Sequence, residues 1–578
     1  MSTARPLLLP TAFYLEGFKS FVLQPAVIPL RPLTLIFGEN SSGKSSIIQG
    51  LWLAGRLLKA GRVPWNADAN RICGVDLGPM ENFVGSTARA KAKSSTNGMK
   101  AGFYLEFKGD LSPDWMADAD REEVQMHWDR ADLTNRECPT PYSMGIIPSV
   151  LEPNCHVRDG AWLFLEIEAQ DEDGLCVTGI SIRTPYFHVR YQGGSEAFAI
   201  DGESTNHPSD RWVEPMQDFG AGIDLPENIA LKSGCLQTAP SNPESERPEA
   251  FQRWFNHLLS QFSDALAALF QDPIHIGAQR SLPRLPYHGH GQWAASRDES
   301  RLWDNLFKEA PAMRQLNGDL AAIGVPYVLK REPVIALEDL RNSVEAWFRA
   351  EPDLDQAVGD DWRESLEKMV TPYATTGIPR TYLATRAAKA AEQAKADYKQ
   401  EARAEFLGNL VNACQREGIL VCDTAFNTEV DLHNVGRGLL SVIYAALFAN
   451  DPDGSLRALE EPELHLHPRL QVAMGDLLFR AVQASGRILL VETHSEHILL
   501  RLLHHVQETH NHEKGDRLPA GDLALVHVGR EHSPWLNCDI TQTRIIRVRP
   551  NGTLNTDEWP GGFFEERLSA IGVEGGRP

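Results

Sequence analysis

The sequence predicts an α/β fold: a mixed sheet around a phosphate-binding loop, with an antiparallel β insertion, a helical insertion and a small C-terminal β unit. Residues 35–51, LIFGENSSGKSSIIQGL, run from an apolar strand through a glycine loop into a helical pattern. From about residue 100 the apolar period changes to two, as in antiparallel hairpins. Helical patterning returns at 249–270 and again at about 335–417.

These changes of pattern predict five parts in chain order. They are an N-terminal lobe with the loop (1–110), a β insertion with its connections (111–248), a helical insertion (249–425), a C-terminal lobe (426–530) and a small C-terminal domain (531–578). Residues 204–248 are rich in Pro, Ser and Glu, which favours exposed connections. Residues 382–415 have the alanine and alternating charges of one long, partly exposed helix, without the sustained heptads of a coiled coil.

Composition limits the environment and the partners of the chain. A net charge of −22 over 578 residues opposes general attraction to nucleic acid or anionic membranes, so any DNA contact requires a local basic patch or a partner. The eight cysteines are scattered without a CxxC pair, as expected in a reducing compartment. No apolar run approaches the roughly 20 residues that span a bilayer. We therefore expect a cytoplasmic protein without a membrane partner.

The glycine loop matches the pattern G-x-x-x-x-G-K-S without substitution. Its glycines let backbone N–H groups face a phosphate, while Lys44 reaches the β- and γ-phosphates of ATP and the Ser45 hydroxyl ligates Mg²⁺. A chance match in a glycine loop is the alternative. The predicted nucleotide-binding residues of this loop are Gly38, Asn40, Ser41, Ser42, Gly43, Lys44, Ser45 and Ser46.

Two later apolar strands end in residues that suit ATP chemistry. The stretch SLRALEEPELHLHP ends its strand at Glu460 and Glu461, which predicts Glu460 as a Mg²⁺ ligand and Glu461 as the residue that orients the attacking water. The stretch GRILLVETHSEH places His494 after another strand, where its imidazole can hydrogen-bond the γ-phosphate. An acidic surface loop and a surface or core histidine are the alternatives. We expect Lys44, Glu461 and His494 to be catalytic.

The combination of GENSSGKS, EEPELHLHP and ETHSEH resembles the ATP-binding-cassette branch of P-loop ATPases. The resemblance is to SMC-like AAA proteins grouped with the overcoming-lysogenization-defect (OLD) ATPases and the ATPases of bacterial anti-phage systems. Further matching pieces are HIGAQRSLPRLPY at 275–287 and VDLHNVGRGLLSVIYAAL at 430–447. The ending GTL…WPGGFFEE resembles a small domain of unassigned function found in a subset of these proteins.

This resemblance implies a head that dimerises, or forms a higher oligomer, with two ATP molecules between two heads. It places residues 464–467 opposite the other protomer and maps the signature that closes on the partner's phosphate to 435–442, with Gly436 and Gly438 as binding residues. Relatives usually have serine where this chain has Leu440, which leaves closure and turnover rate in question. Arg280 falls where relatives carry an arginine, and it either contacts phosphate or the other head, or caps a helix or pairs with an acidic neighbour.

We interpret the other clusters of histidine and basic residues as solvent-exposed surface segments. His504, His505, His510 and His512 resemble a metal site but are better interpreted as a solvated turn, and His288 and His290 are similarly loop-like. The basic residues of 380–405 are interleaved with acids and favour a solvated helix face; this block and the TRIIRVR strand are the candidates for any DNA contact. No DxD pair follows an apolar strand beyond residue 500, so we expect any cutting to belong to another chain.

The leading functional hypothesis is an ATPase that senses or regulates and controls a separate nuclease, such as an HNH protein, in bacterial anti-phage defence. The alternatives are a DNA-repair or chromosome-type head that binds DNA directly, a transporter ATPase subunit, and a nucleotide-locked scaffold that hydrolyses slowly. The long paired coiled coils of the second class are absent from the sequence.

Overall fold

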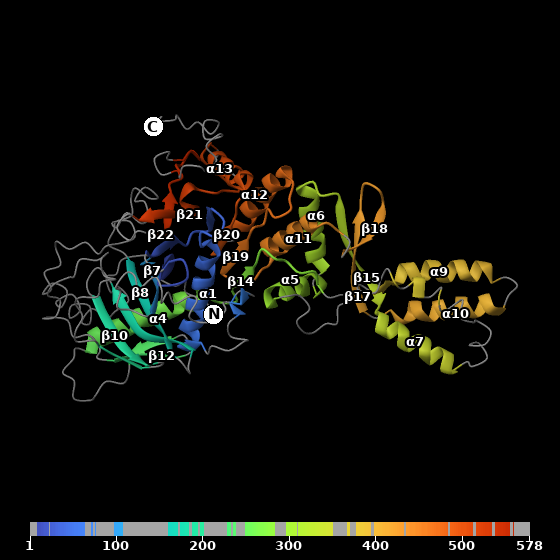
Figure 1. Ribbon diagram of the computed structural model, residues 1–578, viewed down its shortest axis with the longest axis horizontal. Helices are drawn as coiled ribbons and strands as arrows, with labels where there is room; N and C mark the ends of the chain where they lie inside the picture. The colour runs from blue at the N-terminus through green and yellow to red at the C-terminus, as the bar shows by residue number, and fades with distance from the viewer. Residues whose placement is uncertain are drawn as a thin grey trace. The chain divides into compact units, whose positions relative to one another are not determined.

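The computed structural model of the chain (Figure 1) describes residues 8–21, 24–63, 71–72, 75–76, 98–107, 160–170, 174–183, 188–194, 197–200, 228–232, 235–238, 249–283, 296–308, 310–350, 364, 367–369, 371, 377–394, 398–414, 416–432, 435–483, 486–511, 516–533, 538–554 and 559. The chain forms two compact units. Unit 1 takes its residues from Met1–Gly277, Asp453–Glu461 and Phe479–Pro578, and unit 2 from Ala278–Pro452 and Pro462–Leu478.

A six-stranded sheet in unit 1 carries the phosphate-loop strand near its centre. Its order is β14-β19-β20-β3-β21-β22, parallel except for the last pair. β3 is entirely buried, which explains its continuous apolar sequence. The strands are β14 (Ile274–Ile276), β19 (Leu456–Glu460), β20 (Ile488–Glu492), β3 (Leu33–Gly38), β21 (Leu523–Ser533) and β22 (Cys538–Ile546).

An antiparallel sheet forms the second layer of unit 1 and confirms the predicted hairpins. Its order is β13-β12-β11-β10-β9-β8-β7-β1-β2, and β4 pairs with β9. The strands are β13 (Cys235–Thr238), β12 (Asn228–Lys232), β11 (Ala197–Ile200), β10 (His188–Gly194), β9 (Gly174–Arg183), β8 (Gly160–Gln170), β7 (Gly98–Phe107), β1 (Leu8–Glu16), β2 (Ala26–Pro29) and β4 (Arg62–Val63). β5 (Arg71–Ile72) and β6 (Val75–Asp76) pair separately.

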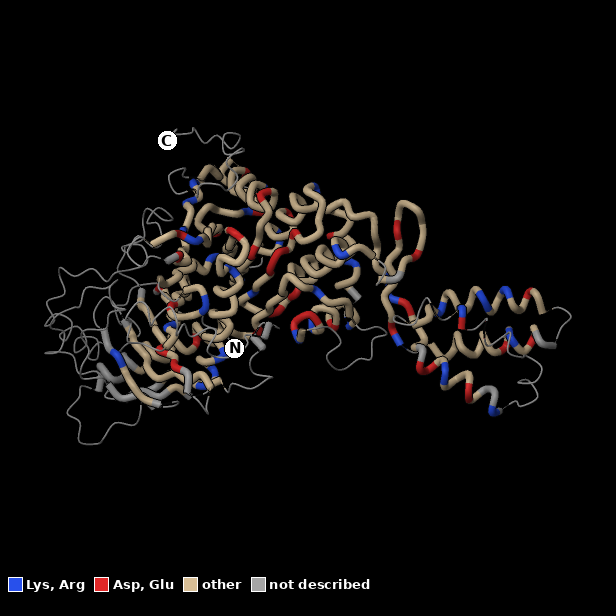
Figure 2. Tube along the Cα trace, in the orientation of Figure 1, with Lys and Arg blue, Asp and Glu red and all other residues tan. Residues whose placement is uncertain are grey.

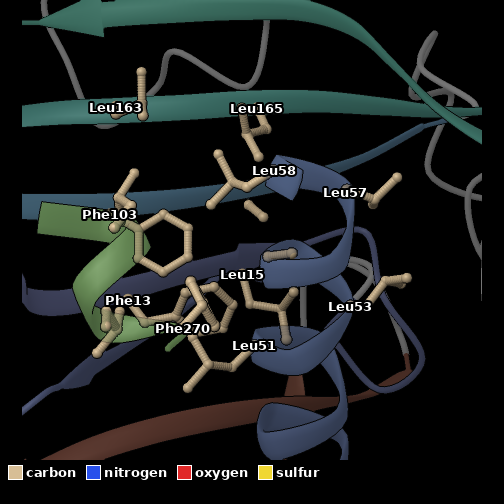
Figure 3. Packing of buried hydrophobic residues seen from close by; sticks show 14 of the residues in the cluster. Phe13, Leu15, Leu51, Leu53, Leu57, Leu58, Phe103, Leu163, Leu165 and Phe270 are labelled. Carbon is tan, nitrogen blue, oxygen red and sulfur yellow. The ribbon is translucent and has the colours of Figure 1, made fainter. Parts of the chain in front are cut away.

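The helix α1 (Lys44–Ala60) joins both sheets in one hydrophobic core. Leu51 and Leu58 of this helix lie in the same buried cluster as Phe103 and Leu165 of the antiparallel sheet and Ile36 of β3 (Figure 3). The cluster also includes the buried face of α4 (Glu249–Leu269). This packing fixes the first turn of α1, and with it the phosphate loop, against the central sheet. The remaining elements of unit 1 are α13 (Glu496–Asn511) and the short η6 (Ala520–Asp522).

Unit 2 combines a four-stranded sheet with helices. The strand order is β16-β15-β17-β18, and the helices α7, α9 and α10 form a group with its own core around Leu383, Phe406 and Leu410. Its elements are α5 (Arg297–Lys308), α6 (Ala310–Ala322), β15 (Tyr327–Ile335), α7 (Leu337–Ala350), β16 (Ile378–Pro379), α9 (Arg380–Gln393), α10 (Tyr398–Ala413), β17 (Arg416–Asp423), β18 (Thr428–Asp431) and α11 (Arg437–Asn450). α12 (Pro468–Val482) begins in unit 2 and ends in unit 1.

Two expectations from the sequence differ from the structure. The single helix expected over 382–415 is two helices, α9 and α10, which pack on each other and thereby bury Leu383 and Phe406. The predicted connections at 204–248 contain the strands β12 and β13, whose pairing with β11 is a tertiary contact. Most of the predicted C-terminal domain, apart from Trp559, lies outside the described residues beyond 554.

The five-part domain division stays a prediction, because the two compact units follow spatial contacts and not chain order. Across the described ranges, no helix has both the length and the apolar character needed to cross a membrane.

Candidate ATP-binding site

The phosphate loop ends in a helix whose first N–H groups have no side-chain cap. Gly43 is the N-cap of α1, with φ 107°, and the first turn contains no acidic residue. Such a helix start favours an anion, because its free N–H groups and the helix dipole both carry positive charge. Gly38 has φ 148°, and a Cβ there would lie 2.0 Å from the carbonyl oxygen of Val528. Only glycine therefore fits at the end of β3.

Two polar side chains of the loop, Lys44 and Ser45, have defined partners, and one buried hydroxyl does not. Lys44 Nζ donates to the carbonyl oxygens of Glu39 at 2.7 Å and Gly38 at 3.3 Å. Ser45 Oγ donates to Glu492 Oε2 at 2.8 Å. The buried Ser42 Oγ has no hydrogen-bond partner among the described residues. An orphaned hydroxyl inside a phosphate loop fits a ligand that accepts or donates a hydrogen bond there.

The other predicted loop residues lie around this cradle. Asn40 and Ser41 are exposed, and Ser41 has a left-handed backbone with φ 60°. The carbonyl oxygen of Ser41 accepts a hydrogen bond from Arg530 at 2.7 Å, and Ser46 N–H donates to Gly43 O at 3.1 Å. The loop is thus held from outside while its inner face stays available.

Three neighbouring parallel strands bring the acidic residues to the loop. β20 pairs with β3 on one side and with β19 on the other, and Glu492 is opposite Glu460 in register. The backbone N–H of Glu461 donates to Glu492 O at 2.7 Å. Ligand atoms of Glu461, Glu492 and His494 all lie within 4.8 Å of one another. The structure therefore places Lys44, Ser45, Glu461 and His494 together at the carboxyl ends of these strands.

Electrostatics in this cluster are set by burial and by the neighbouring carboxylates. Burial, followed by the charge of Glu460, raises the pKa of Glu492 to about 7, against the lowering effects of the Ser45 hydrogen bond and Lys44. Burial and the charge of Lys44 lower the pKa of His494, so its imidazole is neutral at pH 7. A neutral imidazole can donate one hydrogen bond and accept another.

Glu460, the predicted metal ligand, contacts a buried histidine through one of its oxygens. Its Oε1 lies 2.9 Å from His275 Nε2, and both side chains are buried. The His275 ring also meets the edge of Trp52 at 5.8 Å between centroids. The carboxylate that contacts Ser45 is instead Glu492. Sequence reasoning missed both Glu492 and His275; the signal for Glu492 was an acidic residue ending an otherwise apolar strand.

The oxygen donors of this cluster suit Mg²⁺. Magnesium prefers hard oxygen ligands and uses one or two carboxylates together with substrate phosphates. Ser45 offers a hydroxyl, and Glu461 and Glu492 offer carboxylates within the distances given above. The residues present therefore fit the ion that the phosphate loop implies.

The predicted signature lies in unit 2 at the start of α11. Gly436 is the N-cap, without a side-chain hydrogen bond and without an acidic residue in the first turn. A Cβ on Gly438 would lie 2.7 Å from the carbonyl oxygen of His465, so the helix start and the loop after the carboxylates touch. Leu440 is buried, with 6% of its surface exposed.

Ser441 cannot replace the missing signature hydroxyl without breaking internal bonds. Its Oγ donates to the carbonyl oxygen of Leu464 at 3.1 Å and accepts from Arg280 at 3.2 Å. The side chain is 4% exposed. Of the alternatives for Arg280, the contact observed is with this helix.

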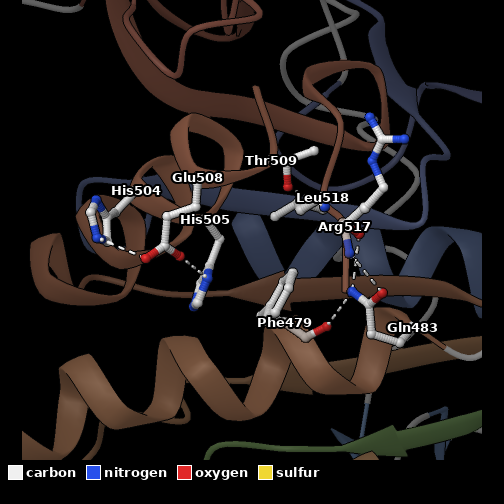
Figure 4. Close-up of polar contacts among 8 residues, drawn as sticks. All are labelled: Phe479, Gln483, His504, His505, Glu508, Thr509, Arg517 and Leu518. Carbon is white, nitrogen blue, oxygen red and sulfur yellow. Dashed lines mark hydrogen bonds and ion pairs between the residues drawn. The ribbon is translucent and has the colours of Figure 1, made fainter. Parts of the chain in front are cut away.

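The histidines near the end of α13 form a packed and ion-paired group (Figure 4). His504 and His505 lie 3.2 Å and 3.0 Å from the two carboxylate oxygens of Glu508, and His505 stacks on Phe479 with ring centroids 4.0 Å apart. His510 belongs to the same helix, so the expected turn is helical up to Asn511. His512, His288 and His290 lie outside the described residues. Within the described ranges these side chains form no group with metal-ligand spacing.

Comparison with known proteins supports an ATPase. The family described as "AAA domain, putative AbiEii toxin, Type IV TA system" matches residues 331–500, and a family described as "AAA domain" matches residues 13–55. No curated protein matches the chain.

Solved structures with similarity to the chain include SMC heads, at low TM-scores. The SMC head bound to the C-winged helix domain of ScpA is 9% identical, with a TM-score of 0.33, and 93% of this chain and 97% of that one are covered. The SMC head domain from Thermotoga maritima is 9% identical with a TM-score of 0.31, covering 92% and 98%. The matched AAA domains, the strand order and the phosphate loop after β3 are consistent with the α/β fold of a P-loop ATPase head.

Proposed function

We propose that the chain binds Mg²⁺-ATP at the site in unit 1 and hydrolyses it. The observation that carries the proposal is the meeting of the phosphate loop with Glu461, Glu492 and His494 at the ends of adjacent strands. Lys44 binds the β- and γ-phosphates, Glu461 orients the attacking water, and the neutral His494 hydrogen-bonds the γ-phosphate. The remaining predicted loop residues surround the phosphates.

Ser45 and a carboxylate would hold Mg²⁺, for which the sequence favours Glu460. When bound, the ion neutralises charge that develops on the phosphates. The backbone of Glu461 supports its proposed role, because φ 42° is a strained conformation for glutamate and such strain concentrates at functional sites. The Pro462 that follows and the hydrogen bond from Glu461 N–H to Glu492 O hold that conformation.

We further propose that two heads close on two nucleotides. The uncapped N-terminus of α11, with Gly436 and Gly438, supports phosphate binding in the partner's site through backbone N–H groups. Leu440 supplies no hydroxyl, and the Ser441 hydroxyl is already bonded. The proposal is therefore slow turnover and a long-lived closed state.

The biological role that we propose is control of a separate effector in bacterial anti-phage defence, with a nuclease such as an HNH protein as the effector. The resemblance of the three motifs supports it, as does the matched family, whose description names a toxin of a type IV system. Among the described residues, the group with metal-ligand spacing is at the ATP site. The described residues thus contain no second group of this kind that could hold a metal for cutting chemistry.

Mass and turnover measured together test the proposal. We expect ATP to convert monomer to dimer in light scattering coupled to gel filtration, Lys44→Ala to abolish both dimer and phosphate release, and Glu461→Gln to retain the dimer. Lys308→Ala is the matched control, because this lysine is exposed and pairs with Asp304 within its own helix. The proposal would be refuted if ATP did not change the mass of the protein and if both site variants released phosphate at the wild-type rate.

A second candidate function is direct DNA binding by unit 2. Exposed Arg380, Arg386 and Lys389 recur along α9, where Glu392 is the one acidic residue (Figure 2). The chain's net charge of −22 opposes it. Salt-dependent DNA affinity that falls on Arg386→Ala and Lys389→Ala would favour this candidate; no affinity at low salt would remove it.

A further inference from the structure

Glu492 contacts the phosphate loop directly through its side chain. It ends β20, the strand adjacent to β3, whereas Glu460 ends the next strand out. The side chain is buried, and its two oxygens face different loop residues. Oε2 accepts the Ser45 hydroxyl hydrogen at 2.8 Å, and Oε1 lies 4.0 Å from Lys44 Nζ.

Glu460 is engaged elsewhere. Its Oε1 is bonded to His275, whose ring is 3% exposed and rests against Trp52. Moving this carboxylate toward Ser45 would leave a buried imidazole without its hydrogen bond, which costs about 1–3 kcal/mol. The observed contacts therefore divide the work between the two residues: Glu460 holds His275, and Glu492 holds Ser45.

A serine hydroxyl that ligates a cation must turn its hydrogen away from the ion. A carboxyl oxygen behind the hydroxyl achieves this, because it accepts the hydroxyl hydrogen and thereby fixes the direction of the O–H bond. Residues that orient metal ligands in this way typically contribute 10- to 100-fold to metal affinity. The arrangement of Ser45 and Glu492 has this form.

We propose that Glu492 is the positioning residue of the metal site: it accepts the Ser45 hydrogen so that the oxygen lone pairs of Ser45 face Mg²⁺. This inference rests on the proposed function, and it adds a residue that the motifs did not identify. It separates three carboxylates by role, with Glu461 toward the water, Glu492 behind Ser45, and Glu460, held by His275 through Oε1, as the carboxylate proposed for the metal.

A double-mutant cycle on nucleotide binding tests the inference without using turnover. The measured quantity is the ratio of the dissociation constants of a fluorescent ATP analogue in EDTA and in Mg²⁺, for the full chain. We expect Glu492→Ala to reduce this ratio about 10-fold or more, and Glu492→Gln, which keeps an acceptor oxygen, to reduce it less. In a Ser45→Ala background, Glu492→Ala should add little, because it acts through the missing hydroxyl.

The outcomes separate this inference from the proposed function. Additive effects of the two substitutions, or an unchanged ratio in both Glu492 variants, would overturn the role of Glu492 while leaving the ATP site intact. If the wild-type protein bound the ATP analogue equally well in EDTA and in Mg²⁺, the Mg²⁺-ATP site itself would be refuted. Glu531→Ala, an exposed carboxylate paired with Arg544 in the same unit, is the matched control and should leave the ratio unchanged. Thermal unfolding in EDTA shows whether each variant is folded, and Glu492→Gln keeps the test open if Glu492→Ala is not.

Discussion

Glu461 combines a carboxylate next to the phosphate loop with a backbone conformation that glutamate rarely adopts. Its φ is 42°, and its N–H is bonded to Glu492 O. We expect Glu461→Gln to lower the rate of phosphate release by about 100-fold or more, because an amide cannot take the proton of the attacking water. ATP affinity should change little, because the phosphate loop is untouched.

Single-turnover phosphate release and equilibrium binding measure these two quantities separately. Glu345→Gln, an exposed residue paired with Arg349 on α7, is the control and should match the wild type in both. Wild-type release by the Glu461 variant would show that another group orients the water.

The environment of His527 leads us to expect that unit 1 loses stability in acid. Its ring lies 5.5 Å from that of Phe37, and burial, with the charges of Arg544 and Lys44, lowers its pKa to about 4. In the unfolded chain the pKa is about 6.5. Between these values the unfolded chain binds a proton that the folded chain does not, so this stability is present above pH 6.5 and is lost as the pH falls toward 4.

We expect His527→Gln to reduce the acid dependence of unfolding. Denaturant unfolding near pH 7 and near pH 4.5 should show a smaller loss of unfolding free energy in the variant than in the wild type. Equal losses in the two proteins would contradict the assignment. His504→Gln, half exposed on α13, is the control for a histidine change outside this environment.

The sequence identified the residues of this site that sit inside local motifs. Lys44, Ser45, Glu461 and His494 each follow a strand within a recognisable pattern, and the structure brings them together. Glu492 and His275 are defined by cross-strand register instead. Glu492 reaches Ser45 only because β20 lies beside β3, and His275 reaches Glu460 only because β14 lies beside β19. No local pattern encodes such pairings.

At the scale of elements, α1 depends on a glycine that allows close packing. A Cβ on the buried Gly55 would lie 2.4 Å from the ring of Phe270, which follows α4. We expect Gly55→Ala to lower the thermal stability of unit 1 by about 1–3 kcal/mol through overpacking. Circular dichroism during heating measures this change.

Gly408 in α10 is the matched glycine, because nothing lies within 4 Å of an added Cβ there. Gly408→Ala should stabilise unit 2 by about 0.5–1 kcal/mol, since alanine has the higher helix propensity. A stable Gly55→Ala protein would show that Phe270 can move away and that this contact does not fix α1.

The middle of α11 is supported by a buried polar chain in unit 2. The Tyr444 hydroxyl donates to Ser281 O at 2.8 Å and accepts from Trp303 Nε1 at 2.9 Å. Tyr444→Phe leaves both partners buried without this bond, so we expect a loss of about 1–3 kcal/mol in the unfolding free energy of unit 2. Tyr382→Phe on α9 removes a hydroxyl that accepts from the exposed Arg386 and should cost much less. Equal effects, measured by denaturant unfolding, would contradict the buried network.

The periodicity of the sequence predicted which segments are helices and which are strands. It did not predict where a helix is interrupted or which strands pair. The segments that form β8 to β11 show the two-residue alternation of apolar side chains that is typical of strands, and they pair as antiparallel neighbours. The break between α9 and α10 carries no Gly or Pro, and folding back is favoured because it buries Leu383 with Phe406. β12 and β13 lack a strong local pattern and exist through pairing along the sheet.

At the scale of the whole molecule, the order of residues along the chain differs from their arrangement in space. Unit 1 is assembled from three separate stretches, and its sheet joins β3 near the N-terminus with β21 and β22 near the C-terminus. Trp559 stacks on Phe37 next to the phosphate loop, with centroids 5.7 Å apart. The sequence predicted two lobes of one ATPase head, but contacts of this range depend on the folded sheet.

The most direct test is a crystal structure of the Glu461→Gln protein grown with Mg²⁺ and ATP. The result expected is one triphosphate whose γ-phosphate lies within hydrogen-bond distance of Lys44 and His494, with the metal on Ser45 and Glu492 behind that hydroxyl. Nucleotide bound away from residues 38–46, or a metal that avoids Ser45 and the glutamates at the ends of β19 and β20, would contradict the ATP site described above.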